Sequence, residues 1–245
     1  MIPLGRPDLV RRSGGPHEIY LRARGFARRT RAGDRYEIVL LLIVVVVLLT
    51  PLETSGLRPV ISALQVLIFA FAFWTSGAPR RVFRVACVVG VVALAVAAIS
   101  QIFVGDTSRL GFTAVGIFLC AGTIIAIITR LASQSRVTRR TVTGALSVYL
   151  LIGLLFTYTY MLIGTVAERG FFAQSGPHPP TDYLYFSYVT LTTVGYGDLT
   201  AGFSFGRILA VLEALMGQLY LVTIVAVVIA NIGRDRSGPR GRDTQ

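Results

Sequence analysis

The chain is poor in charge, cysteine and histidine, and it contains no lysine. Charged residues make up 15% of its 245 residues, hydrophobic residues make up 53%, and the mean hydropathy is +0.67. The core of an ordinary soluble domain cannot hide this much apolar surface. The composition therefore excludes a soluble globular protein and indicates an integral membrane protein.

The few reactive side chains are not arranged for catalysis. Cys87 and Cys120 lie inside apolar stretches and lack the compartment and the partner that a disulfide needs, so we expect both to be packing residues. The sequence has no metal-ligand cluster, no phosphate-binding glycine loop with a lysine and no nucleophile paired with a base. We expect no enzyme activity and no organic cofactor. We interpret His178 as a solvated loop residue, with a group that titrates near neutral pH as the alternative.

Six apolar stretches are candidates for transmembrane helices. They cover residues 36–51, 60–78, 82–104, 110–129, 142–164 and 205–232. The first is short for a span and needs its flanks. Residues 1–35 lack the apolar core of a cleaved signal peptide, so we expect the first span to be retained.

The arginines are distributed as a six-span topology with an internal N-terminus requires. The inner segments then hold twenty of the 24 basic residues, in groups of nine up to Arg35, three at 80–84, four at 130–140 and four at 234–242. We therefore expect a plasma-membrane protein with both termini in the cytoplasm. This topology and anionic lipid at the inner leaflet explain the net charge of +12, so no nucleic-acid partner is expected.

The sequence Thr-Val-Gly-Tyr-Gly at residues 193–197, here called the TVGYG strip, predicts a potassium pore. Four such strips supply stacked rings of backbone carbonyls that replace the water shell of K⁺. Gly195 and Gly197 are needed because aligned carbonyls demand backbone angles that a residue with a Cβ reaches only at a cost. One strip per chain implies a homotetramer. We expect K⁺ as the permeant ion at Thr193, Val194, Gly195 and Tyr196, with Gly197 completing the strip.

The segment before the strip is typical of a re-entrant hairpin. Residues 164–181 form a polar approach rich in Gly and Pro, and Thr181 or Asp182 is expected to cap a short helix over residues 182–192. The negative end of that helix would point toward the membrane centre and favour a cation there. The predicted fold class is all-α integral membrane, with six transmembrane helices and a re-entrant pore helix and selectivity filter between the fifth and sixth.

Residues 142–233 resemble the two-helix pore module of tetrameric potassium channels. The resemblance implies a gating hinge at Gly217, twenty positions after Gly197, although a small residue for close helix packing is an alternative. It also implies that Gln218, Leu221 and Val225 line the cavity, because their spacing keeps them on one helix face.

The resemblance also suggests which residues support the filter. Tyr185 stands where several family members have a Trp bonded to the Asp after the filter, here Asp198, and Thr192 would support the end of the pore helix. Val189 replaces a buried carboxyl that one relative has behind the filter. A three-part clamp is therefore not expected.

Apart from Glu37, the second residue of the first candidate, Glu213 is the one acid inside a predicted span, and ionisable groups at such depth are functional candidates. One interpretation is an acid that attracts cations or senses protons. The other, which we prefer, is a buried side chain bonded to the pore helix near Ser187 or Tyr188.

The first four predicted spans lack a strong voltage sensor. Residues 110–129 contain no charge, whereas each charge that crosses the field contributes about 2.3 kcal/mol per 100 mV. Arg84 lies at a helix end, where basic side chains reach the headgroups. We divide the chain into a basic cytoplasmic tail (1–35), a four-helix membrane domain (36–130), a pore domain (131–233) and a short cytoplasmic tail (234–245).

The function predicted from the sequence is passive, K⁺-selective conduction through a homotetramer that is not strongly voltage-gated. One alternative is a voltage-gated potassium channel with an atypical sensor. Others are the membrane subunit of a K⁺ uptake transporter, and a receptor or scaffold that keeps a vestigial pore.

Overall fold

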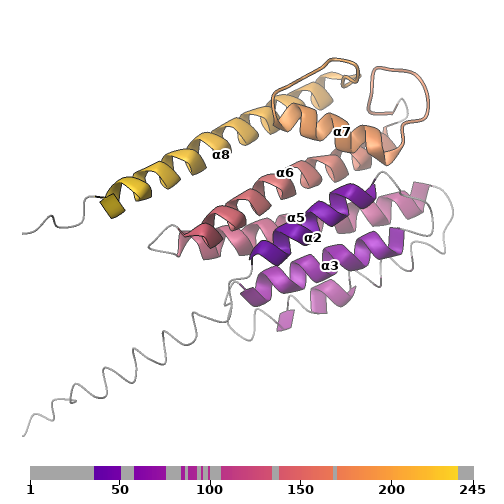
Figure 1. Ribbon diagram of the computed structural model, residues 1–245. Coiled ribbons are helices and arrows are strands. Elements are labelled where there is room, and N and C mark those ends of the chain that lie inside the picture. The colour runs from indigo at the N-terminus through magenta and orange to yellow at the C-terminus, as the bar shows by residue number, and fades with distance from the viewer. Residues whose placement is uncertain are drawn as a thin grey trace, which may run out of the picture. The chain divides into compact units, whose positions relative to one another are not determined.

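The structure, a computed structural model, describes residues 36–50, 58–75, 84–85, 88–92, 95, 99, 106–133, 138–167 and 170–236. The named helices are α2 (Tyr36–Leu49), α3 (Arg58–Thr75), α5 (Asp106–Ala132), α6 (Arg139–Val166), α7 (Pro180–Leu191) and α8 (Ser204–Arg236) (Figure 1). In these ranges the only strand-like pairing is one isolated bridge, between Phe172 and Ala201.

The predicted spans correspond to helices wherever the structure describes them. Among the described residues, three helices are long and apolar enough to cross a membrane, Arg109–Ala132, Thr141–Val166 and Ser204–Ala230, so the fourth, fifth and sixth predicted spans are confirmed as such helices. The first two predicted spans are apolar helices too, but shorter ones, Tyr36–Leu49 and Val60–Trp74. The third predicted span, with Cys87, lies mostly outside the described residues, as do the whole of the 1–35 tail and residues 237–245.

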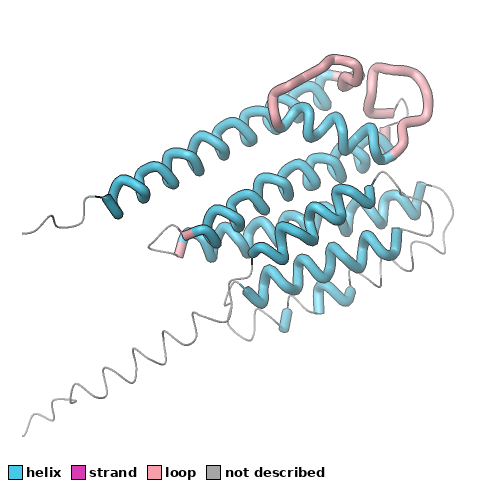
Figure 2. Tube along the Cα trace, in the orientation of Figure 1, coloured by secondary structure: helices cyan, strands magenta, loops and turns pink. Residues whose placement is uncertain are grey.

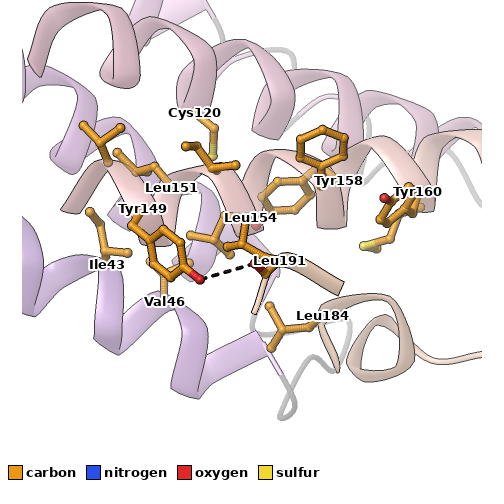
Figure 3. Packing of buried hydrophobic residues seen from close by; sticks show 14 of the residues in the cluster. Ile43, Val46, Cys120, Tyr149, Leu151, Leu154, Tyr158, Tyr160, Leu184 and Leu191 are labelled. Atoms are coloured by element: carbon orange, nitrogen blue, oxygen red, sulfur yellow. Dashed lines mark hydrogen bonds between the residues drawn. The ribbon is translucent and has the colours of Figure 1, made fainter. Parts of the chain in front are cut away.

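Helix α6 is the centre of the packing. It contacts α2, α5, α7 and α8, and Figure 1 shows it between α8 on one side and α2, α3 and α5 on the other. In the apolar stretch of α6 that is long enough to span a membrane, 67% is buried within the chain. The corresponding share for α8 is 11%. The four helices α2, α3, α5 and α6 therefore share a core, part of which Figure 3 shows, whereas α8 leaves most of its apolar surface uncovered.

Two glycines let α5 approach its neighbours closely. A Cβ on Gly116 would lie 2.8 Å from the ring of Tyr158 on α6, and a Cβ on Gly122 would lie 2.6 Å from the ring of Phe69 on α3. Both distances are shorter than atoms tolerate, so each aromatic ring occupies the space that a glycine leaves. Cys120 is buried in the same core, in agreement with its predicted packing role.

Helix α7 begins differently from the prediction. Its first residue is Pro180, Pro179 is the N-cap, and no side chain caps the helix, so the predicted cap by Thr181 or Asp182 is wrong. Proline suits the first turn because its fixed φ is helical and because an N–H at this position would have no partner within the helix. The Asp182 side chain is free to bond elsewhere, and its Oδ2 lies 2.8 Å from Nδ1 of His178.

Two loops flank α7 and meet at one end of it (Figure 2). Backbone bonds join them, from Ala173 N–H to the Thr200 carbonyl at 2.8 Å and from Gly202 N–H to the Phe171 carbonyl at 2.9 Å. The loop that leads into α7 is therefore fixed to the loop that leads from the TVGYG strip into α8.

His178 is held in the first of these loops and is not a solvated residue, which corrects the prediction. Only 14% of its side chain is exposed, and its ring lies 4.7 Å from that of Phe172, centroid to centroid. Nδ1 faces Asp182, and Nε2 lies 3.1 Å from the Gln174 carbonyl. Burial lowers the pKa of His178, but the hydrogen bonds to Asp182 and Gln174 and the charge of Asp182 together raise that pKa above its usual 6.5.

This raised pKa makes the stability of the loop that leads into α7 depend on pH. Because the folded state binds the proton more tightly than the unfolded state, the stabilisation is complete below about pH 6.5 and is lost as the pH rises through the raised pKa. Thermal unfolding of the purified protein in detergent, measured from about pH 5 to pH 9, should show this loss. Asp182→Asn should flatten the dependence, and an unchanged slope in this variant would contradict the assignment.

Candidate functional site

The backbone of the TVGYG strip alternates in handedness. Thr193, Gly195 and Gly197 have positive φ values of 59°, 53° and 83°, whereas Val194 and Tyr196 between them do not. Alternation of this kind turns successive peptide planes so that their carbonyls fall on one side of the strip. A Cβ built on Gly195 or Gly197 would meet nothing within 4 Å, so in this chain backbone conformation, and not crowding, is what requires glycine there.

Thr193 is the only non-glycine residue with positive φ in the part of the chain that the structure describes. A β-branched residue in the left-handed region costs roughly 1–3 kcal/mol, and such strain persists where the surroundings hold the residue in place. The strain makes the start of the strip a candidate functional position.

The end of α7 provides the bonds that hold the strip. The Val189 carbonyl accepts from the N–H groups of Val194 at 3.0 Å and Gly195 at 3.2 Å, and the Thr190 carbonyl accepts from Thr193 N–H at 2.9 Å. Since N–H and C=O point in opposite directions across a trans peptide, the carbonyls of Thr193 and Val194 point away from α7. Thr192 closes the helix as its C-cap, and its hydroxyl donates to the Tyr188 carbonyl at 2.7 Å.

The C-terminal part of the strip, at Tyr196, lies against one side chain of α7. The rings of Tyr185 and Tyr196 are nearly parallel, at 6°, with centroids 6.3 Å apart, and the Tyr185 hydroxyl has the Asp198 carboxyl as a hydrogen-bond partner. Val194 and Tyr196 are otherwise open, at 53% and 71% exposure. The strip thus has one face on α7 and another with no cover within a single chain.

Glu213 lies in a fully buried polar cluster formed by three helices. Its Oε1 is 2.5 Å from the Ser187 hydroxyl of α7, and its Oε2 accepts from the Tyr160 hydroxyl of α6 at 2.7 Å. Of the two neighbours considered from the sequence, Ser187 is in contact, whereas the Tyr188 hydroxyl donates to the Leu150 carbonyl at 2.8 Å. Tyr160 was missed, although a phenol in an apolar span is itself a signal, because a buried hydroxyl needs a partner.

Gly217, one turn after Glu213, is where α8 meets the end of α7. A Cβ on Gly217 would overlap the Leu191 carbonyl oxygen and lie 2.8 Å from the Leu191 Cδ1 atom. The same carbonyl accepts from the Tyr149 hydroxyl at 3.4 Å, as Figure 3 shows. Close packing accounts for a glycine at this position, and the hinge role implied by the resemblance stays a prediction.

The remaining faces of α8 are exposed and apolar. Gln218, Leu221 and Val225, predicted to line a cavity, are all exposed. Other large apolar side chains exposed on this helix are Phe205, Ile208, Val211, Leu212, Leu215, Met216, Leu219, Val222, Val227 and Ile229. A groove of about 410 Å³ beside the strip, lined in part by Gly195, Gly197 and Arg207, continues the uncovered surface.

The close contact at Gly217 makes a stability prediction of definite sign. Ala is the better helix former by about 1 kcal/mol, so Gly217→Ala would stabilise the protein if Gly217 served only as a hinge. The overlap with the Leu191 backbone, which cannot move without moving α7, should instead lower stability by about 1–3 kcal/mol. The measurement is the unfolding midpoint of the detergent-solubilised protein, and a raised midpoint in the variant would show that packing does not explain Gly217.

Comparison with known proteins finds similarity in the segment that holds this site. Residues 144–234 match the sequence model of a family described as "Ion channel", and these residues include the TVGYG strip, α7 and Glu213. The chain is also similar to an inward rectifier potassium channel, Kirbac3.1 of Paramagnetospirillum magnetotacticum, with 33% identity over 90 residues. That match covers 37% of this chain and 29% of the relative, so the similarity is confined to the segment around the strip. Residues 144–234, less than half of the chain, are therefore similar to the ion-channel family, and this segment resembles a bacterial potassium channel.

Proposed function

We propose that four copies of this chain form a K⁺-selective channel in the plasma membrane, through which K⁺ moves passively down its gradient. The observation that carries the proposal is the alternating handedness of the TVGYG strip, with φ of 59°, 53° and 83° at every second residue. This backbone turns carbonyls away from α7 and toward one side, as a ring of dehydrating ligands requires.

In the proposed channel, K⁺ binds between layers of oxygens. The carbonyls of Thr193, Val194, Gly195 and Tyr196 form successive rings, and the Thr193 hydroxyl adds the innermost one. The strip needs no ionised ligand, because carbonyl dipoles replace the ion's water. The C-terminal end of α7, which lies at the Thr193 end of the strip, adds a negative partial charge below it.

The uncovered surfaces support a homotetramer. The whole strip is exposed in one chain, and so is most of α8, with only 11% of its membrane-length apolar stretch buried. Non-helical backbone at membrane depth is stable only where protein or a water-filled cavity surrounds it, and a fourfold arrangement around the strip provides both. Exposed apolar area of this extent marks a surface that another protein surface or lipid covers.

The orientation we propose places α7 on the outer side and both termini in the cytoplasm. His178, Tyr183 and Arg109 line one small cavity of about 40 Å³, so the start of α5 lies beside the start of α7, while Arg130 lies at the opposite end of α5. The twenty arginines in the inner segments would then face anionic headgroups. Gating would occur by movement of α8 with little dependence on voltage, since charged residues on α5 lie only near its two ends.

The selectivity of the proposed channel can be measured in liposomes that contain the purified protein. We expect K⁺ flux well above Na⁺ flux, and roughly tenfold less K⁺ flux in Gly195→Ala, because a Cβ at this φ costs about 1–2 kcal/mol. Gly176→Ala is the matched control, since Gly176 also has a positive φ, of 121°, and open space around it, but lies outside the strip. Equal permeation of Na⁺ and K⁺ in the unmodified protein would rule out the proposed selectivity.

The proposed stoichiometry can be measured by native mass spectrometry of the solubilised protein. Chains with and without a mass tag, expressed together, should give a ladder of complexes of the 26.5-kDa chain that runs from no tag to four tags. A ladder that ends at two tags, or monomers alone, would contradict the tetramer.

A further inference from the structure

The Ser187 hydroxyl lies within hydrogen-bonding distance of two oxygens from two other helices, one from Glu213 and one from Gly153. The Ser187 hydroxyl oxygen of α7 lies 2.5 Å from Glu213 Oε1 of α8 and 2.7 Å from the Gly153 carbonyl oxygen of α6. Both separations are hydrogen-bonding distances. The Gly153 carbonyl also accepts from the Thr157 hydroxyl at 2.8 Å, and Ser187 and Glu213 are both 0% exposed.

The two short contacts at Ser187 require two protons. A serine hydroxyl carries one proton and a peptide carbonyl carries none. If Ser187 donates to Gly153, its contact with Glu213 at 2.5 Å must be bridged by a proton on the carboxyl; if Ser187 donates to Glu213, its contact with Gly153 at 2.7 Å has no proton at all. Only a protonated Glu213 satisfies both contacts, as donor to Ser187 through Oε1 and acceptor from Tyr160 through Oε2.

The part of the chain that the structure describes places no cation beside Glu213 that would hold it as a carboxylate. The titratable groups that face it are phenols, Tyr149 and Tyr160 on α6 and Tyr188 on α7. Among the described residues no arginine or histidine interacts with its carboxyl, whose polar partners are Ser187 and Tyr160. A carboxylate buried without a cation is costly, whereas a carboxylic acid with a donor and an acceptor is satisfied.

We infer that Glu213 is a neutral carboxylic acid that joins α6, α7 and α8 behind the TVGYG strip as a positioning residue. Its proton bonds to Ser187, Ser187 bonds to Gly153, and Tyr160 completes the carboxyl. These bonds, together with the contact between Gly217 and Leu191 one turn further on, fix the part of α8 up to Gly217 to α7. Bending of α8 is therefore confined to the part that follows Gly217. Loss of the proton leaves one of the two Ser187 contacts, either with Glu213 or with Gly153, without a proton between its two oxygens, so that contact must lengthen.

The proton can be detected directly by infrared spectroscopy. The purified protein near pH 7 should absorb in the C=O stretching region of protonated carboxyls, and Glu213→Gln should lose this band. Ser187→Ala removes the acceptor of the acid proton and should move the band to higher frequency, a change that a purely structural role for Glu213 would not cause. A protein without a carboxylic-acid band that Glu213→Gln removes would overturn the inference.

Flux measurements give a second readout, and this one rests on the proposed channel function. Glu213→Gln should conduct K⁺ like the unmodified protein, because the amide nitrogen can donate to Ser187 while the amide oxygen accepts from Tyr160. Glu213→Leu, similar in volume but without these bonds, should lose at least about tenfold in flux. Reduced K⁺ flux in Glu213→Gln would indicate a working carboxylate and contradict the inference. An unmodified protein that carries no flux would refute the channel function alone, since the infrared result does not depend on conduction.

Discussion

The arrangement of the site depends on the Val189 carbonyl, which accepts hydrogen bonds from two successive N–H groups of the TVGYG strip. These two bonds turn the first carbonyls of the strip away from α7. Every displacement of α7 is therefore transmitted to the strip. The rest of the pore segment can be understood as the means by which α7 is kept in place.

Three contacts keep α7 in place from behind. The Ser187 hydroxyl bonds both Gly153 of α6 and Glu213 of α8, and the end of α7 at Leu191 lies against Gly217. The side of α7 that faces its own chain thus combines these specific contacts with apolar packing of Leu184, Phe186 and Leu191, whereas the apolar side of α8 is open. This difference separates what one chain determines by itself, the position of α7, from what we propose that neighbouring chains complete, the walls of the pore.

The helices and the TVGYG strip were predictable because each depends on local pattern. Long apolar runs gave the three spans of membrane length, and the need for glycine at positions 195 and 197 follows from backbone conformation alone. The start of α7 was misplaced because Thr181 and Asp182 are both good caps by residue type, whereas in the structure Pro179 is the N-cap and Asp182 is bonded to His178.

Other features of the site depend on contacts between residues distant in sequence. Tyr160 lies 53 positions before Glu213, and no local rule pairs them. The environment of His178 is likewise set by the packing of its ring on Phe172 and by the carbonyl of Gln174. For Gly217, the sequence left a hinge and a packing contact open, and only the neighbouring Leu191 carbonyl reveals the packing contact.

The central claim is that the strips of four chains form a row of sites for K⁺. It is tested most directly by X-ray diffraction from crystals of the assembled protein in which K⁺ has been replaced by Tl⁺, an ion of similar size that scatters anomalously. The account predicts a row of anomalous peaks on the fourfold axis, level with Thr193 to Tyr196. A fourfold assembly without such peaks, or peaks that persist unchanged when Na⁺ replaces Tl⁺, would contradict it.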